Sequence, residues 1–137
     1  MQNIEHIGIA VRDLKISIPL FEQLLNTNCY KTEVVESEKV TTAFFKKGDT
    51  KIELLESMDE DGVIAKFIAG KGEGMHHIAL TVHDIEAEMK RLAASGFNLL
   101  NAVPKKGADN KLVCFLHPKT TNGVLIELCQ EMNEESH

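Results

Sequence analysis

The sequence repeats itself at an offset of 77 − 6 = 71 residues. Residues 6–14, HIGIAVRDL, align without a gap with residues 77–85, HIALTVHDI. The register continues into the next segment, where each copy carries an apolar stripe with helical spacing i, i+4, i+7. The stripes are Leu14, Ile18 and Phe21 in the first copy and Ile85, Met89 and Leu92 in the second. A repeat of this kind predicts that one structural unit is built twice.

Each copy predicts a strand, an amphipathic helix and then further strands. Asp13 and Asp84 precede the helices at the position of an N-cap. Pro19 predicts a kink or a restart of the first helix near Ser17. β-rich runs follow the helices at residues 40–45 and 51–55, and again at 112–116 and 124–128.

The expected fold is α+β, with two βαβββ repeats that form a curved mixed sheet around a central cleft. We expect one domain over residues 1–137, with repeat one at 1–57, a linker at 58–74 and repeat two at 75–131. A chain of 137 residues is long enough for such a core. Apolar residues between 63 and 68 predict a short helix in the linker, and the glycines of residues 70–74 predict a hinge.

Strand alternation gives the two repeated histidines a common orientation. His6 and His77 lie opposite the apolar residues of their strands, so both should face the cleft. Glu53 and Glu127 lie between apolar neighbours in matched strands, and a carboxylate there is costly to bury without a partner or a metal. We therefore predict that these four residues hold one divalent cation. Mixed N and O ligands suit Zn, Mn, Co, Ni or Fe(II) better than a metal that prefers thiolates, and the sequence does not distinguish these metals from one another or from Mg.

Two other histidines fit structural roles better. His76 points to the opposite face from His77, which favours a structural hydrogen bond. His117 precedes Pro118 and is more typical of a residue at a strand end or turn than of a catalytic group.

Composition excludes several classes of partner. The formal net charge of −6 makes a general attraction to nucleic acid improbable, and no apolar stretch is long enough to span a membrane. Three cysteines at unrelated spacings are typical of a reducing cytoplasm. Lys105, Lys106 and Lys111 form a local basic cluster, for which a solvated loop and a site for an anionic ligand are the two interpretations.

The chain resembles the vicinal-oxygen-chelate, or glyoxalase-like, superfamily and within it the methylmalonyl-CoA epimerases. The resemblance rests on residues 3–11, 51–56, 72–79, 115–118 and 123–128. It implies an enzyme that interconverts (2R)- and (2S)-methylmalonyl-CoA through an enolate. It also implies that His6, His77 and Glu127 bind the metal, with Glu53 at a fourth position that relatives fill with Gln or Glu.

Epimerisation needs a proton to leave one face of C2 and return to the other. Many relatives carry a Glu for this purpose where this chain has Thr42, which cannot act as a base. We therefore expect Glu53 and Glu127 to share the proton transfer. The lysines at 105, 106 and 111 are expected to bind the CoA phosphates. The resemblance implies a homodimer, and the cysteines predict a cytoplasmic location.

Alternative functions differ in chemistry. Glyoxalase I, the lactoylglutathione lyase, uses a similar set of ligands, but the absence of Trp and the pattern of the second half favour the epimerase. An extradiol dioxygenase needs Fe(II) and usually a longer chain. A binding module of the same fold would hold a small ligand without a metal.

Overall fold

The computed structural model describes residues 3–132 and divides the chain into two compact units. One unit comprises His6–His76, and the other comprises His77–His137 together with Met1–Glu5. None of the helices within the described residues is long and apolar enough to cross a membrane.

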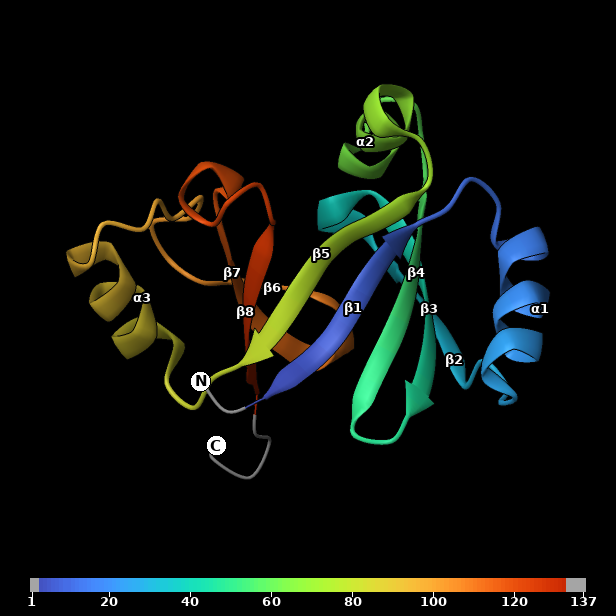
Figure 1. The fold of residues 1–137 in the computed structure, drawn as a ribbon, viewed down its shortest axis with the longest axis horizontal. Helices are drawn as coiled ribbons and strands as arrows, with labels where there is room; N and C mark the ends of the chain where they lie inside the picture. Colours follow the sequence, from blue (N-terminus) through green and yellow to red (C-terminus); the bar gives the residue numbers. More distant parts are fainter. Residues whose placement is uncertain (1–2, 133–137) are drawn as a thin grey trace. The chain divides into compact units, whose positions relative to one another are not determined.

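The unit His6–His76 contains four strands of a mixed sheet and two α-helices (Figure 1). Its strands follow the order β2-β3-β4-β1, in which β1 is parallel to β4 and the other neighbours are antiparallel. The elements are β1 (Ile4–Ala10), α1 (Leu14–Leu25), β2 (Lys31–Val35), β3 (Val40–Lys47), β4 (Thr50–Ser57) and α2 (Val63–Lys71).

The unit that begins at His77 repeats this topology. Its strands follow the order β5-β8-β7-β6, again with the first and last strands of the repeat parallel, here β5 and β8. The elements are β5 (Gly74–Thr81), α3 (Ile85–Ala94), β6 (Lys105–Lys106), β7 (Lys111–Leu116) and β8 (Ile126–Glu131). The α+β class and the two βαβββ repeats are thus confirmed.

Each long helix packs its predicted stripe on one face of its own sheet. Leu14, Ile18 and Phe21 of α1 belong to one core cluster with strand residues such as Phe45 and Leu54. The stripe of α3 is fully buried in the corresponding cluster, which includes Leu128. Burial of these apolar faces leaves the opposite face of each sheet for polar side chains.

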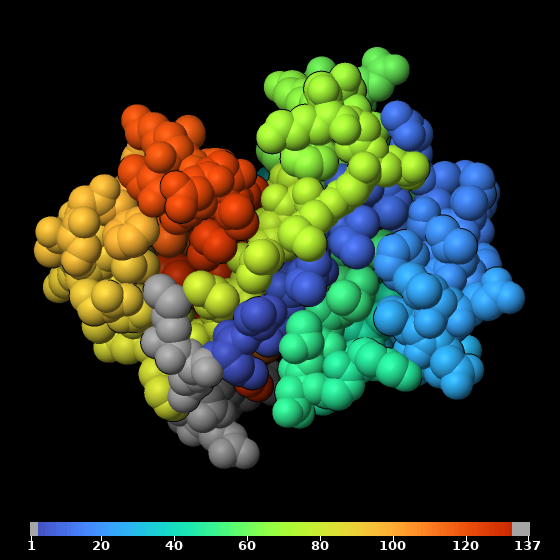
Figure 2. Space-filling view, viewed as in Figure 1, coloured from blue at the N-terminus to red at the C-terminus, as the bar shows by residue number. Residues whose placement is uncertain are grey.

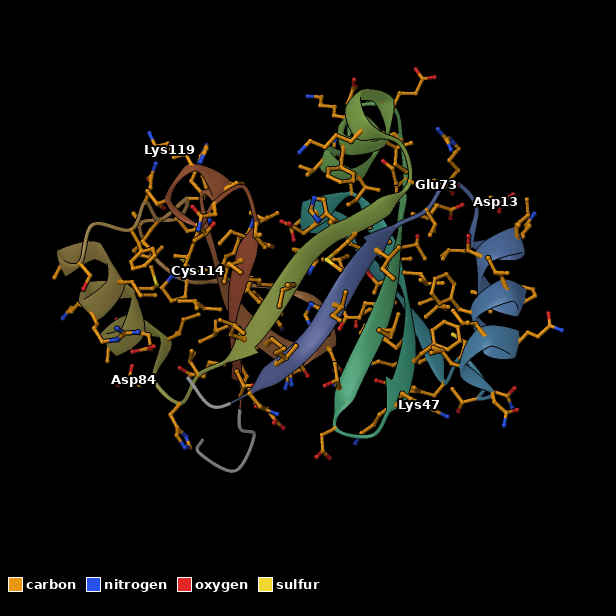
Figure 3. The ribbon with its side chains drawn as sticks, viewed as in Figure 1. Asp13, Lys47, Glu73, Asp84, Cys114 and Lys119 are labelled. Carbon is orange, nitrogen blue, oxygen red and sulfur yellow. The ribbon has the colours of Figure 1, made fainter. Side chains whose placement is uncertain are left out.

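The N-caps are as expected, but the effect of Pro19 is not. The carboxylate of Asp13 accepts a hydrogen bond from the backbone N–H of Lys15 at 2.9 Å, and that of Asp84 accepts one from Ala87 at 3.1 Å (Figure 3). Each cap contributes about 1 kcal/mol to helix stability. The prediction of a restart near Ser17 is wrong, because α1 begins at Leu14 and contains Pro19 within one helix.

The sequence missed one strand in each unit. β2 pairs with β3 but has only two apolar residues, Val34 and Val35, so it carries a weak strand pattern. The predicted solvated loop at 105–111 is wrong at its start, because Lys105 and Lys106 form β6 and pair with Val113 and Leu112 of β7. The predicted helix in the linker is confirmed by α2.

Candidate functional site

A buried imidazole and carboxylate lie together in the unit His6–His76. His6 comes from β1 and Glu53 from β4, and the two side chains are on the sheet face opposite α1. Nδ1 of His6 is 3.2 Å from Oε2 of Glu53, and the two residues are only 5% and 4% exposed. Gly8 is paired with Glu53 across the parallel strands, so the β1 residue directly beside Glu53 has no side chain.

The other unit contains the same arrangement. His77 comes from β5 and Glu127 from β8, and Nε2 of His77 is 3.0 Å from Oε1 of Glu127. Both residues are buried. Ala79 is paired with Glu127 as Gly8 is paired with Glu53, so a small residue again lies next to the carboxylate. The repeat in the sequence therefore yields two imidazole–carboxylate pairs, which differ in the ring nitrogen that faces the carboxylate: Nδ1 in His6 and Nε2 in His77.

The spacing within each pair fits two ligands of one cation. Imidazole nitrogen and carboxylate oxygen bind Zn²⁺ and similar metals at about 2.0–2.2 Å, which separates the two donor atoms by roughly 3.0–3.4 Å. The separations of 3.2 Å and 3.0 Å lie in or next to this range. Neutral imidazole and ionised carboxylate are also the donor types that borderline divalent metals prefer.

Each carboxylate has a phenylalanine directly opposite it on the neighbouring antiparallel strand. Phe44 of β3 is paired with Glu53, and Phe115 of β7 is paired with Glu127. The ring of Phe115 meets the His77 imidazole edge to face, with the ring centroids 5.7 Å apart and the planes at 85°. Their apolar side chains do not mark Phe44 and Phe115 as part of a site, although the two residues are related by the same offset of 115 − 44 = 71.

Thr42 lies on the same face of its sheet as Phe44, two residues away on β3, and is almost fully buried. Its direct partner on β4 is Leu55. A threonine hydroxyl is not basic at neutral pH, so the proton chemistry of this unit depends on its other side chains.

The three lysines of the predicted basic cluster differ in environment. Lys106 is exposed, whereas Lys105 is partly buried in β6. Lys111 is buried, with Nζ 3.9 Å from Oε2 of Glu5 and 4.0 Å from Oε2 of Glu131. Lys106 is therefore the most accessible cation of the cluster.

His76, His117 and Cys114 lie in structural environments. His76 meets the ring of Phe67 in α2 edge to face, with centroids 4.9 Å apart. Nδ1 of His117 accepts a hydrogen bond from the backbone N–H of Lys119 at 3.0 Å, which confirms the predicted turn role. Burial raises the pKa of the Cys114 thiol, which lies in the α3 core (Figure 3). A raised pKa keeps this thiol protonated and unreactive at neutral pH.

Comparison with known proteins gives matches over nearly the whole chain. The family model described as the glyoxalase/bleomycin resistance protein/dioxygenase superfamily matches residues 5–115. The uncharacterized protein YqjC of Bacillus subtilis is 36% identical over 135 residues, which cover 98% of this chain and 96% of that protein. The ethylmalonyl-CoA/methylmalonyl-CoA epimerase of Cereibacter sphaeroides is 38% identical over 129 residues, with coverage of 93% and 96%.

A solved structure is also similar. A variant of Streptomyces coelicolor methylmalonyl-CoA epimerase in complex with 2-nitronate-propionyl-CoA has a TM-score of 0.92 and 34% identity to this chain. The match covers 96% of this chain and 95% of that chain.

Proposed function

We propose that the protein interconverts (2R)- and (2S)-methylmalonyl-CoA. The chain belongs to the glyoxalase/bleomycin resistance protein/dioxygenase superfamily, as the sequence indicated, and it is similar to methylmalonyl-CoA epimerases. The single observation that carries the proposal is the buried imidazole–carboxylate pair found in both units. Buried groups of this kind are costly to keep unless they perform a function or are well paired.

His6, Glu53, His77 and Glu127 are proposed to hold one divalent cation jointly. Each pair alone offers only two donors, whereas catalytic zinc sites have three protein ligands and structural sites have four. Two pairs from a duplicated unit supply four. When bound, the cation would supply Lewis acidity at the thioester oxygen, where negative charge gathers as the C2 proton leaves.

The two carboxylates are proposed to carry out the proton transfer. Epimerisation requires one group to remove the proton and another to return it on the opposite face. Thr42 cannot do so, whereas Glu53 and Glu127 supply one carboxylate from each unit. The proposed roles are therefore symmetrical: Glu53 acts as base toward one epimer and Glu127 toward the other.

The function is tested by two assays on one preparation purified without chelator. Methylmalonyl-CoA of a single C2 configuration is expected to be converted to the mixture of epimers, as followed by circular dichroism or a stereospecific coupled assay. The hemithioacetal of methylglyoxal and glutathione is expected to be left unchanged. Turnover of the hemithioacetal alone would reject the epimerase in favour of glyoxalase I.

Lys105 and Lys106 are proposed to contact the phosphates of the CoA moiety. Changing both to Ala is expected to raise KM for methylmalonyl-CoA several-fold with little change in kcat, because a uniform binding contact is lost. The effect should shrink as ionic strength rises, since contacts between exposed charges are screened. The exposed Lys90 on α3 offers a control, as its replacement by Ala removes one positive charge from another surface. An unchanged KM in the double variant excludes the proposal.

The exposed side of α1 supports the proposal of a homodimer. Six of its residues face solvent, and only one is charged: Lys15, Ile16, Pro19, Leu20, Gln23 and Leu24. The matched residues of α3 are also exposed but include three charges: Glu86, Ala87, Lys90, Arg91, Ala94 and Ser95. The helix α1 is drawn in mid-blue in the space-filling view (Figure 2). Equivalent helices thus differ in the surface they offer to solvent.

A second copy of the chain fits this apolar stripe. Two copies of one helix face can meet about a two-fold axis, and an antiparallel crossing also opposes their dipoles favourably. Light scattering is expected to give twice the chain mass of 15.2 kDa. The variant Leu20→Lys should give the mass of one chain, while Arg91→Lys on α3 should not. A dimer that survives Leu20→Lys would exclude this face.

A further inference from the structure

Phe44 and Phe115 occupy equivalent positions in the two units. Each lies directly opposite a buried carboxylate, on the antiparallel strand next to it. The backbone N–H of Phe115 donates to Oδ1 of Asn101, and its carbonyl oxygen accepts from the N–H of Leu100. Both polar groups of Phe115 therefore point away from β8, so Phe115 and Glu127 form a pair without direct hydrogen bonds, in which side chains approach most closely.

The same reasoning applies to Phe44, but the surroundings of its ring are different. Its carbonyl oxygen accepts from the N–H of Tyr30, on the side away from Glu53. The Phe44 side chain is fully buried, its ring lies 6.0 Å from that of Tyr30, and Nζ of Lys31 lies 4.7 Å from its centroid. These contacts give Phe44 a packing role in its own unit.

We propose that Phe115 is a positioning residue that fixes the orientation of the His77 imidazole. An imidazole can turn about its Cβ–Cγ bond, and only some orientations point Nε2 at Glu127. The perpendicular contact with Phe115, at 5.7 Å between centroids, and the 3.0 Å contact with Glu127 both restrict this rotation. Phe115 and Glu127 are themselves neighbours across the strands, so the three side chains support one another.

The role of the oriented His77 imidazole in metal binding rests on the proposed function. The contact between Phe115 and His77 does not depend on that function. A metal ligand must present one nitrogen in a fixed direction, and groups that orient a ligating imidazole tune the affinity of the site. Phe115 supplies no polar atom, so its contribution is steric and electrostatic through the ring. A fixed His77 imidazole is therefore expected in the protein before any metal is added.

The experiment measures the orientation of His77 directly in metal-free protein. Nitrogen-15 NMR of labelled histidine, with NOEs from the His77 ring protons, is recorded for Phe115→Leu, Phe115→Met and Phe115→Tyr. Phe97→Leu is the matched control, because Phe97 is in the same unit but packs against the α3 core. If Phe115→Leu does not fold, Phe115→Met provides a second aliphatic replacement for the same measurement.

The wild-type protein is expected to show one set of His77 ring NOEs, including contacts to Phe115. Phe115→Leu and Phe115→Met should replace it with averaged signals from more than one ring orientation, whereas Phe115→Tyr and Phe97→Leu should preserve it. Unchanged His77 signals in both aliphatic variants would overturn the proposal. Equal averaging in Phe97→Leu would also overturn it, because the effect would then be a general loosening of the unit.

A titration with Co²⁺ then separates this inference from the function on which it rests. Phe115→Leu is expected to bind Co²⁺ about three- to tenfold more weakly than wild type, with Phe115→Tyr close to wild type. Failure of the wild-type protein to bind Co²⁺ would reject the proposed metal site while leaving the NMR result for Phe115 intact. Wild-type affinity in Phe115→Leu would overturn the effect of Phe115 on metal binding.

Discussion

Replacing Glu127 with Gln is expected to lower kcat for epimerisation by about 10³-fold or more. The amide is nearly the same size as the carboxylate, so the packing next to His77 and Ala79 should be preserved. The amide cannot take up a proton from C2, and as a neutral oxygen ligand it holds a cation more weakly than the carboxylate does. The change therefore removes the proposed base and weakens the proposed ligand.

The control for this variant is Glu131→Gln on the same strand. Glu131 has a side chain that is 80% exposed and pairs only loosely with Lys111, so its loss should leave kcat within about twofold. Initial rates at saturating methylmalonyl-CoA, together with thermal unfolding of each variant, provide the measurement. A kcat for Glu127→Gln within tenfold of wild type would remove Glu127 from the chemistry.

Glu53→Gln is expected to separate the role of a ligand from the role of a base. An amide oxygen can still coordinate a cation, so metal content should be retained, but the amide cannot accept a proton. Exchange of the C2 hydrogen with solvent deuterium is therefore expected to fall by at least about 10²-fold when one epimer is the starting material. Exchange from the other epimer should be much less affected, because Glu127 acts on its face.

Glu56→Gln is the matched control for Glu53→Gln. Glu56 is on the same strand but on the other face, where its carboxylate accepts a hydrogen bond from the N–H of Leu14. Its replacement should leave exchange from both epimers unchanged. If Glu53→Gln also leaves exchange from both epimers unchanged, Glu53 takes no part in proton transfer.

Much of the fold could be predicted because each helix or strand pattern occurs in both copies of the repeat. The stripes of α1 and α3 and the alternation of β1 and β5 were visible in the sequence as helical and strand periods. β2 could not be located, since its lysine, threonine and glutamate obscure the apolar side of the strand. β6 is only two residues long, which is too short to produce any period.

The candidate site could be predicted in part for the same reason. Residue type and strand alternation singled out the four residues, and the structure places His6 next to Glu53 and His77 next to Glu127. The contact of Phe115 with His77 was missed, because its apolar side chain gave no reason to look for it among ligands. The joint binding of one cation, the roles of the lysines and a cytoplasmic location stay predictions.

The central claim is that both pairs serve one metal, and the number of metals bound per chain tests it most directly. Metal-free protein is titrated with Co²⁺ in the wild type and in the variants His6→Ala and His77→Ala, one from each unit. The account predicts one Co²⁺ per chain and a loss of affinity of at least about tenfold in either variant. Two Co²⁺ per chain, or full affinity in one of the two variants, would contradict it.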